Sequence, residues 1–166
     1  MSNATEKVSP IVAGPGEGEA LWFMDFLATV KSTAESTGGA VAVIEHLAAL
    51  GAGSPLHVHS REDEWFYVIE GELTFWVGGE VSVAPAGSFV FGPKGLPHTF
   101  MVSSEQARFL LVTEPGGFEG FMRAGAVPAQ RLEIPPAPTE PPDIVAMSAL
   151  AAEYGIEILG PPGIPD

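Results

Sequence analysis

The chain has 166 residues, which is enough for one ordinary domain with its own core. Its apolar fraction of 46% and charged fraction of 17% are typical of a folded globular protein and not of a disordered one. Seven Lys and Arg against 21 Asp and Glu give a formal net charge of -14, which argues against nucleic acid or an anionic membrane surface as partner and leaves a small molecule, an ion or a second copy of the chain.

Short β-branched and aromatic runs, separated by glycine and proline, predict a series of strands through the first two thirds of the chain. The predicted strands are Ala20–Val30, Gly39–Leu50, Glu64–Ile69, Leu73–Val77, Glu80–Val83, Ser88–Gly92, His98–Val102 and Ala107–Thr113. Because no long helix separates them, they predict an antiparallel sandwich or barrel and leave no room for the crossover helices of a parallel sheet.

After Thr113 the pattern changes. A short helix is expected at Gly117–Ala124, and residues 127–142 are rich in proline and expected to run extended along the surface. Asp143 can cap a second helix at Ile144–Tyr154, which Gly155 would end. The prediction is therefore a barrel with N-terminal strands in residues 1–125, with its motif core at 41–113, followed in residues 126–166 by a linker, a short helix and a tail packed on the barrel.

The longest apolar runs are strand-length and too short to cross a bilayer, and the start MSNATEKVSP lacks the basic and apolar regions of a secretory signal. We therefore expect no membrane partner and a cytoplasmic location.

The segment SPLHVHSREDEW places His57 and His59 two residues apart, so that on an extended segment both imidazoles point to the same face. Glu64 begins the next apolar run and shares a strand face with Phe66 and Val68. A carboxylate on such a face is costly unless it is paired or binds a cation.

A third imidazole, His98, follows the loop GPKGLP at the start of another predicted strand, where it shares a face with Phe100. One histidine on an apolar face is more often a hydrogen-bonded core residue, and a single His-x-His is weak evidence for a metal. Three imidazoles and a carboxylate in one barrel, in a chain with few cations and no cysteine, favour a site for one divalent transition-metal ion held by His57, His59, Glu64 and His98.

These residues carry a resemblance to the cupin superfamily. Its first motif matches Gly51, five residues, His57-Val58-His59, four residues, Glu64, six residues and Gly71; its second matches Gly87, five residues, Pro93-Lys94-Gly95, two residues and His98. The resemblance implies an all-β double-stranded β-helix, or jelly-roll barrel, here with a small C-terminal helical appendage, and a metal held by the same four residues. The chain departs from the second motif where Val102 stands at a position that is commonly Asn.

Three imidazoles and one carboxylate suit Fe, Mn, Co, Ni, Cu or Zn without choosing among them. Four protein ligands leave open positions for substrate, water or dioxygen, and Glu64 is the candidate catalytic base toward a bound hydroxyl. Phe66 and Phe100 are the candidate lining of a substrate pocket, which favours an aromatic small molecule. His46 is expected to be structural or exposed, with a place in the pocket near the metal as the alternative.

The C-terminal stretch PPDIVAMSALAAEYGIEILGPP resembles the tail of single-domain cupins grouped with quercetin 2,3-dioxygenases. This resemblance implies a metal-dependent dioxygenase that cleaves a flavonol or a related enolic aromatic, with the glutamate as base and loss of carbon monoxide. The alternatives are a non-oxidative metal-dependent isomerase or lyase, and a non-catalytic cupin that binds a metal or small molecule.

A homodimer is the expected assembly, because uncovered edge strands invite pairing. The first thirty residues, with Leu21, Trp22 and Phe23, could supply part of that contact or line the mouth of the barrel.

Overall fold

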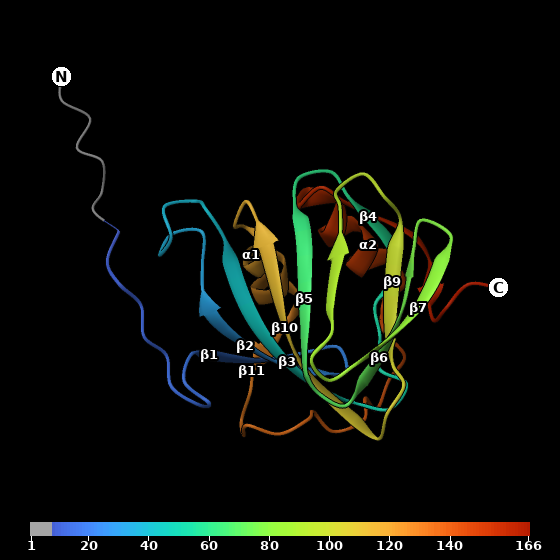
Figure 1. Cartoon of the computed structure of the whole chain (residues 1–166), viewed down its shortest axis with the longest axis horizontal. Coiled ribbons are helices and arrows are strands. Elements are labelled where there is room, and N and C mark those ends of the chain that lie inside the picture. Colours follow the sequence, from blue (N-terminus) through green and yellow to red (C-terminus); the bar gives the residue numbers. More distant parts are fainter. Residues whose placement is uncertain (1–7) are drawn as a thin grey trace.

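The structure, a computed structural model, describes residues 8–166, and twelve strands and two helices lie within them (Figure 1). The strands are β1 (Glu19–Phe23), β2 (Phe26–Ser32), β3 (Ala42–Ala49), β4 (Pro55–His59), β5 (Asp63–Glu70), β6 (Glu72–Val77), β7 (Glu80–Pro85), β8 (Phe89–Gly92), β9 (His98–Val102), β10 (Gln106–Glu114), β11 (Val127–Pro128) and β12 (Ile156–Pro162). The helices are α1 (Phe118–Gly125) and α2 (Ile144–Glu153). The absence of a secretory signal was predicted partly on residues 1–7, which lie outside the described residues.

All strand pairs are antiparallel and form two sheets. The first has the order β11-β1-β2-β3-β10-β5-β8, and the second has the order β12-β4-β9-β6-β7. Aromatic rings join the sheets in one core: Phe66 of β5 contacts Phe75 of β6 at 5.0 Å between ring centroids, and Phe100 of β9 contacts Phe109 of β10 at 5.3 Å. The prediction of an all-β, two-sheet fold with small helical additions is confirmed.

The prediction of one long strand at Ala20–Val30 is wrong. The segment folds as the hairpin β1–β2, in which Phe23 pairs with Phe26 around the two turn residues Met24 and Asp25. Met24 adopts a left-handed φ of 51°, which lets the chain reverse within two residues. Asp25 is a common turn residue, but no glycine, proline or asparagine stands beside it, so the sequence indicates this turn only weakly.

Three strands were not predicted: β4, β11 and β12. The sequence predicts an extended segment at β4 but no strand, because Pro55 and two histidines interrupt the usual apolar alternation. β12 follows α2 in the tail and pairs with β4, and β11 pairs with β1, so residues beyond 125 belong to both sheets. The division into a barrel and an appended segment remains a prediction.

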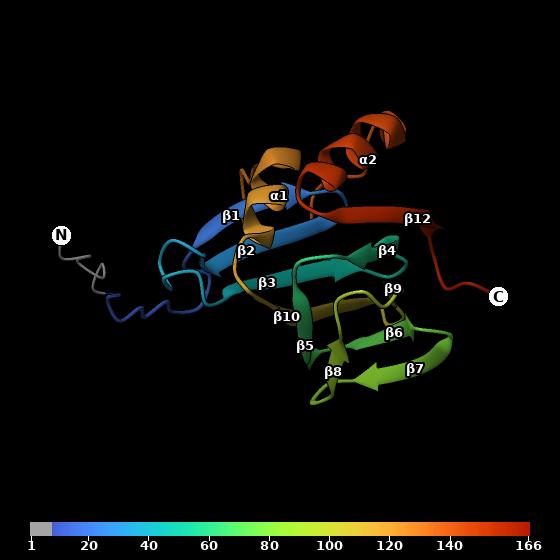
Figure 2. The same ribbon diagram turned by 90° about the horizontal axis from the view of Figure 1, so that it is seen from above.

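Both predicted helices are present, and they lie together on the side of the molecule away from β7 and β8 (Figure 2). Asp143 caps α2 as expected, since its side chain accepts a hydrogen bond of 3.0 Å from the backbone N–H of Ala146. Gly155, with a φ of 75°, follows the last turn and lets the chain enter β12 at once. Within residues 8–166, neither helix has the length and apolarity needed to cross a membrane.

Candidate metal centre

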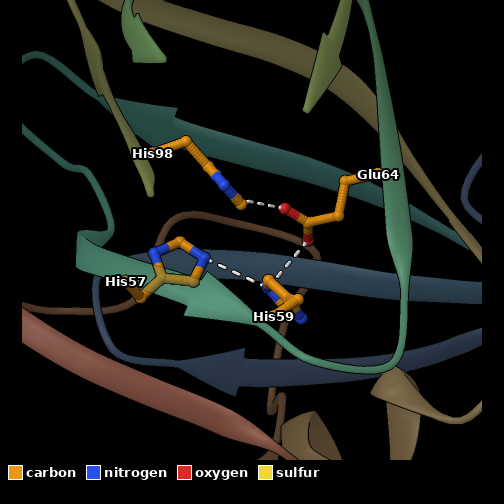
Figure 3. A group of neighbouring side chains, drawn as sticks. All are labelled: His57, His59, Glu64 and His98. Atoms are coloured by element: carbon orange, nitrogen blue, oxygen red, sulfur yellow. Dashed lines mark hydrogen bonds and ion pairs between the residues drawn. The ribbon is translucent and has the colours of Figure 1, made fainter. Parts of the chain in front are cut away.

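Three strands bring the four predicted residues together. His57 and His59 lie in β4 with one residue between them, Glu64 lies near the start of β5, and His98 is the first residue of β9. His57 and His98 are paired opposite each other, which places the third imidazole beside the first two. All four side chains point toward one another (Figure 3), and one candidate ligand atom from each lies within 4.8 Å of the others.

The contacts inside the cluster are made by the Nε2 atoms of the three imidazoles and the carboxylate oxygens of Glu64. His57 Nε2 lies 3.1 Å from His59 Nε2, His98 Nε2 lies 2.6 Å from Glu64 Oε2, and His59 Nε2 lies 3.4 Å from Glu64 Oε1. All four residues are buried, and His59 has no exposed surface. The cluster is therefore a compact polar site inside the barrel.

Each histidine is fixed by an acceptor at its other ring nitrogen. The Nδ1 of His57 donates to the carbonyl of Pro55 at 2.7 Å, and that of His98 donates to the carbonyl of Leu96 at 2.9 Å. The Nδ1 of His59 donates to the buried carboxylate of Glu62 at 3.1 Å. Because these acceptors hold a ring proton at Nδ1, the Nε2 atoms of His57 and His59 present their lone pairs to the cluster, as metal-binding histidines do, and that of His98 would do so once the proton that it shares with Glu64 is lost.

The short distance between the Nε2 atoms of His57 and His59 is the one expected if a cation binds between them. With both Nδ1 atoms protonated, two Nε2 lone pairs face each other at 3.1 Å, and a hydrogen bond between them requires one ring to be an imidazolium. Burial, with the neighbouring charge of His98, lowers the pKa of His57 to about 3, so protonation of that ring is disfavoured at neutral pH. A metal ion accepts both lone pairs at once.

Glu64 and His98 form a charged pair within the same cluster. Burial alone would raise the pKa of Glu64, but the charge of His59 and the hydrogen bond from His98 lower it to about 2. Burial works against the protonated form of His98, yet the hydrogen bond to Glu64 raises its pKa. The carboxylate is therefore ionised at neutral pH, as a metal ligand must be.

A cavity opens beside this cluster, and His57 and Glu64 form part of its wall. Phe66 and Phe100, predicted as pocket residues, line it, whereas Phe89 and Phe91 of β8 are exposed. The other lining residues come from β1, β2, β3, β4, β10, β12 and both helices, and from the segments next to them: Phe23, Met24, Phe26, His46, Ser54, Pro55, Leu111, Phe118, Phe121, Met122, Met147, Ile156 and Ile158. The cavity measures about 70 Å³.

Two residues near the site were not assigned to it from the sequence. Glu62 is 4% exposed and holds His59, although the run Glu62-Asp63-Glu64 resembles a solvated charged turn. His46 of β3 is buried and lines the cavity, which was the less favoured of its expected places. The period of two along β3 could have indicated that His46 is buried, because it puts His46 on the same face as Ile44 and Ala48.

Fold and site together define a two-sheet jelly-roll protein with a buried cluster of three imidazoles and a carboxylate. Residues 43–113 match the family described as Cupin domain, and these residues contain all four members of the cluster. These residues are therefore similar to a cupin domain, and the chain resembles the quercetin 2,3-dioxygenase group.

The relatives agree on the fold. Over 131 residues, or 79% of this chain, it is 29% identical to quercetin 2,3-dioxygenase of Bacillus subtilis. The chain spans 39% and 51% of the lengths of the two curated relatives it matches. A predicted oxalate decarboxylase from Thermotoga maritima superposes with a TM-score of 0.59 at 19% identity, covering 63% of this chain and 99% of that one. An RmlC-like cupin from Shewanella frigidimarina gives 0.57 at 18% identity, covering 69% and 99%.

Proposed function

We propose that this protein is a metal-dependent dioxygenase that cleaves a flavonol or a related enolic aromatic. One observation carries the proposal: three Nε2 atoms and the Glu64 carboxylate converge in a buried site beside an apolar cavity. His57, His59, Glu64 and His98 would hold one divalent transition-metal ion. When bound, that ion supplies coordination positions at which dioxygen and an electron-rich substrate oxygen can meet.

Residues of the chain would orient the metal ligands, accept a proton from the substrate and exclude water. Pro55, Glu62 and Leu96 keep the three imidazoles oriented through their Nδ1 atoms. Glu64 has two carboxylate oxygens, of which one contacts His98 and the other faces His59, so one oxygen can hold the ion while the other takes a proton from a substrate hydroxyl. The apolar wall keeps bulk water away from the reacting atoms.

The charge of the cavity supports a neutral aromatic substrate. Among residues 8–166, none of the lysines and arginines lines the cavity, and its polar groups are confined to Ser54, the backbone and the imidazole and carboxylate side chains. An anionic substrate such as a dicarboxylate or a sugar phosphate would have only the metal to balance its charge. Phenyl and enol groups, in contrast, find ring contacts with Phe26, Phe66 and Phe100.

The size of the cavity favours a second candidate. Its volume of about 70 Å³ is well below the roughly 300–1,000 Å³ that is usual for ligand pockets. A flavonol would enter only if flexible side chains such as Met24, Met122 and Met147 change rotamer. A non-oxidative isomerase or lyase with a smaller neutral substrate is therefore the alternative.

The deciding experiment is dioxygen uptake with quercetin, using protein stripped of metal and reloaded separately with Fe, Mn, Co, Ni or Cu. Uptake that requires one of these metals, releases carbon monoxide and disappears in Glu64→Ala and His98→Ala would support the dioxygenase. Glu80→Ala, which removes an exposed carboxylate of β7, is the matched control and should retain full uptake.

Full metal occupancy without dioxygen consumption would contradict the dioxygenase and favour the non-oxidative alternative. A homodimer and a cytoplasmic location remain predictions, which gel filtration with light scattering and cell fractionation would test.

A further inference from the structure

We propose that His46 is a substrate-binding residue, whose imidazole forms a hydrogen bond with a second polar group of the molecule that occupies the cavity. This inference rests on the proposed function of the same cavity. It adds one requirement to the proposed substrate. The molecule must have two separated polar groups, of which one reaches the metal centre and the other reaches His46.

The position of His46 is set by aromatic packing. Its ring stacks on Phe109 at 5.0 Å between centroids with an interplanar angle of 6°, and it meets Phe26 edge-on at 5.6 Å. The strand pairing reinforces this arrangement, because His46 lies opposite Phe109 in β10 and Ala28 in β2. The imidazole is therefore held in one orientation before any ligand arrives.

His46 also has unused hydrogen-bonding capacity. Only 5% of the residue is exposed, and its Nδ1 makes no well-formed hydrogen bond in the described part of the chain, although the backbone of Ile44 is close enough to raise the pKa of the ring. The three histidines of the metal centre differ in this respect, since each Nδ1 has an acceptor. Packing alone does not explain a polar ring here, because a phenyl ring would fill the same place without leaving a buried nitrogen unpaired.

The cavity connects His46 to the metal centre. His46, His57 and Glu64 all belong to its wall, and the surface between them is formed by rings such as Phe26, Phe66 and Phe100. A flat molecule lying against these rings can place one oxygen at the metal centre and a second polar group at the imidazole. His46 and Ser54 are the polar side chains of the wall outside the four-residue cluster, and Ser54 is already bonded through its hydroxyl to Phe100 N–H.

The protonation state of His46 suits a neutral partner. Burial lowers its pKa to about 4, although the backbone of Ile44 and the Glu64 carboxylate partly oppose this effect. At neutral pH the ring therefore has one N–H donor and one acceptor nitrogen, and it can accept a hydrogen bond from a phenol or donate one to a carbonyl. A hydroxylated aromatic meets this requirement.

The test compares two probes that share the metal-binding unit and differ in their other hydroxyls: quercetin and 3-hydroxyflavone. Anaerobic binding of each to zinc-loaded protein is measured by titration calorimetry for the wild type, His46→Phe and His46→Gln. The wild type should bind quercetin more tightly, and His46→Phe should lose about tenfold for quercetin with little change for 3-hydroxyflavone. His46→Gln, which keeps a polar group at the site, should recover part of the preference.

A second readout follows the ring itself. The chain has four histidines, so the side-chain nitrogen spectrum of zinc-loaded protein is simple, and His46→Gln assigns the His46 signals. Quercetin should shift a ring-nitrogen resonance of His46, whereas 3-hydroxyflavone should not. An equal loss of affinity for both probes in His46→Phe, an unchanged ratio, or an unmoved resonance would overturn the role of His46.

These measurements separate the two proposals, because neither the calorimetry nor the nitrogen spectrum requires turnover. Preferential binding of quercetin without dioxygen consumption would leave His46 as a ligand-binding residue and contradict only the dioxygenase. Failure of both flavonols to bind protein with full zinc occupancy would overturn the role given to His46, while the metal centre itself would stand.

Discussion

Ile158 lies directly opposite His57 where β12 pairs with β4, and Ile156 lies opposite His59 in the same way. The strand that carries two of the four cluster residues is thus held on one side by β9 and on the other by the last strand of the chain. Both isoleucines also line the cavity. The tail therefore supports the four-residue cluster and closes the cavity beside it.

Deletion of residues 156–166 should weaken metal binding and lower the free energy of unfolding. Without β12, β4 becomes an edge strand and loses the backbone hydrogen bonds that keep His57 and His59 in register. We expect metal affinity to fall about tenfold or more, measured by competition with a chromophoric chelator. Deletion of residues 163–166, which follow β12, is the control, and equal affinity in the two truncated proteins would contradict the supporting role.

Glu62→Gln should lower metal affinity by about 10- to 100-fold with little effect on folding. The Glu62 carboxylate accepts the Nδ1 proton of His59 at 3.1 Å, which orients the ring and increases the electron density at its Nε2. An amide keeps the shape but removes the negative charge. The same chelator competition measures the loss, and Glu70→Gln, at an exposed carboxylate paired with Arg108, is the matched control. Unchanged affinity in Glu62→Gln would show that the contact does not tune the centre.

The cluster could be predicted from the sequence because its geometry is mostly local. His57 and His59 share a strand face by the period of two, and β9 starts at His98, as the alternation of His98, Phe100 and Val102 indicates. Gly71, which the first motif also identified, has a φ of 77°, and its close approach to the carbonyl of Gln106 leaves no space for a side chain.

The missed features depend on contacts between distant parts of the chain. β12 is a strand because β4 offers it an unpaired edge about a hundred residues earlier, and nothing within the tail itself indicates that partner. The place of His46 in the cavity likewise depends on Phe26 and Phe109 from other strands. Glu62 is the exception, because its partner His59 is only three residues away; its burial was missed because the neighbouring charges Asp63 and Glu64 predict a solvated turn.

Metal-free protein should lose stability as the pH falls below about 6.5, and His46 should account for part of the loss. The pKa of His46 is about 4 in the folded protein and 6.5 in the unfolded chain, so the unfolded chain takes up the proton first. His57, with a folded pKa of about 3, acts in the same direction. A raised pKa at His98 acts oppositely: its stabilisation is complete below the unfolded value and is lost as the pH rises through the folded one.

The contribution of His46 is isolated by comparison with His46→Phe. Between pH 8 and pH 5 the free energy of unfolding of the wild type should fall by about 2 kcal/mol more than that of the variant. Urea unfolding of the metal-free proteins at both pH values measures the difference. Parallel losses in the two proteins would mean that His46 titrates normally in the folded state.

Metal binding should release a proton from His98 at neutral pH. In the metal-free protein the imidazolium of His98 donates through Nε2 to Glu64 at 2.6 Å and through Nδ1 to Leu96 at 2.9 Å, and its pKa is raised. An ion that binds Nε2 must displace the proton held there, so the apparent affinity should rise with pH until His98 is neutral, by at most about tenfold per pH unit. Calorimetric titration with zinc in two buffers of different ionisation enthalpy counts the protons released. His98→Gln keeps a polar side chain but removes the titrating group, so its weaker binding should release fewer protons, whereas identical release in both proteins would assign the proton to another residue.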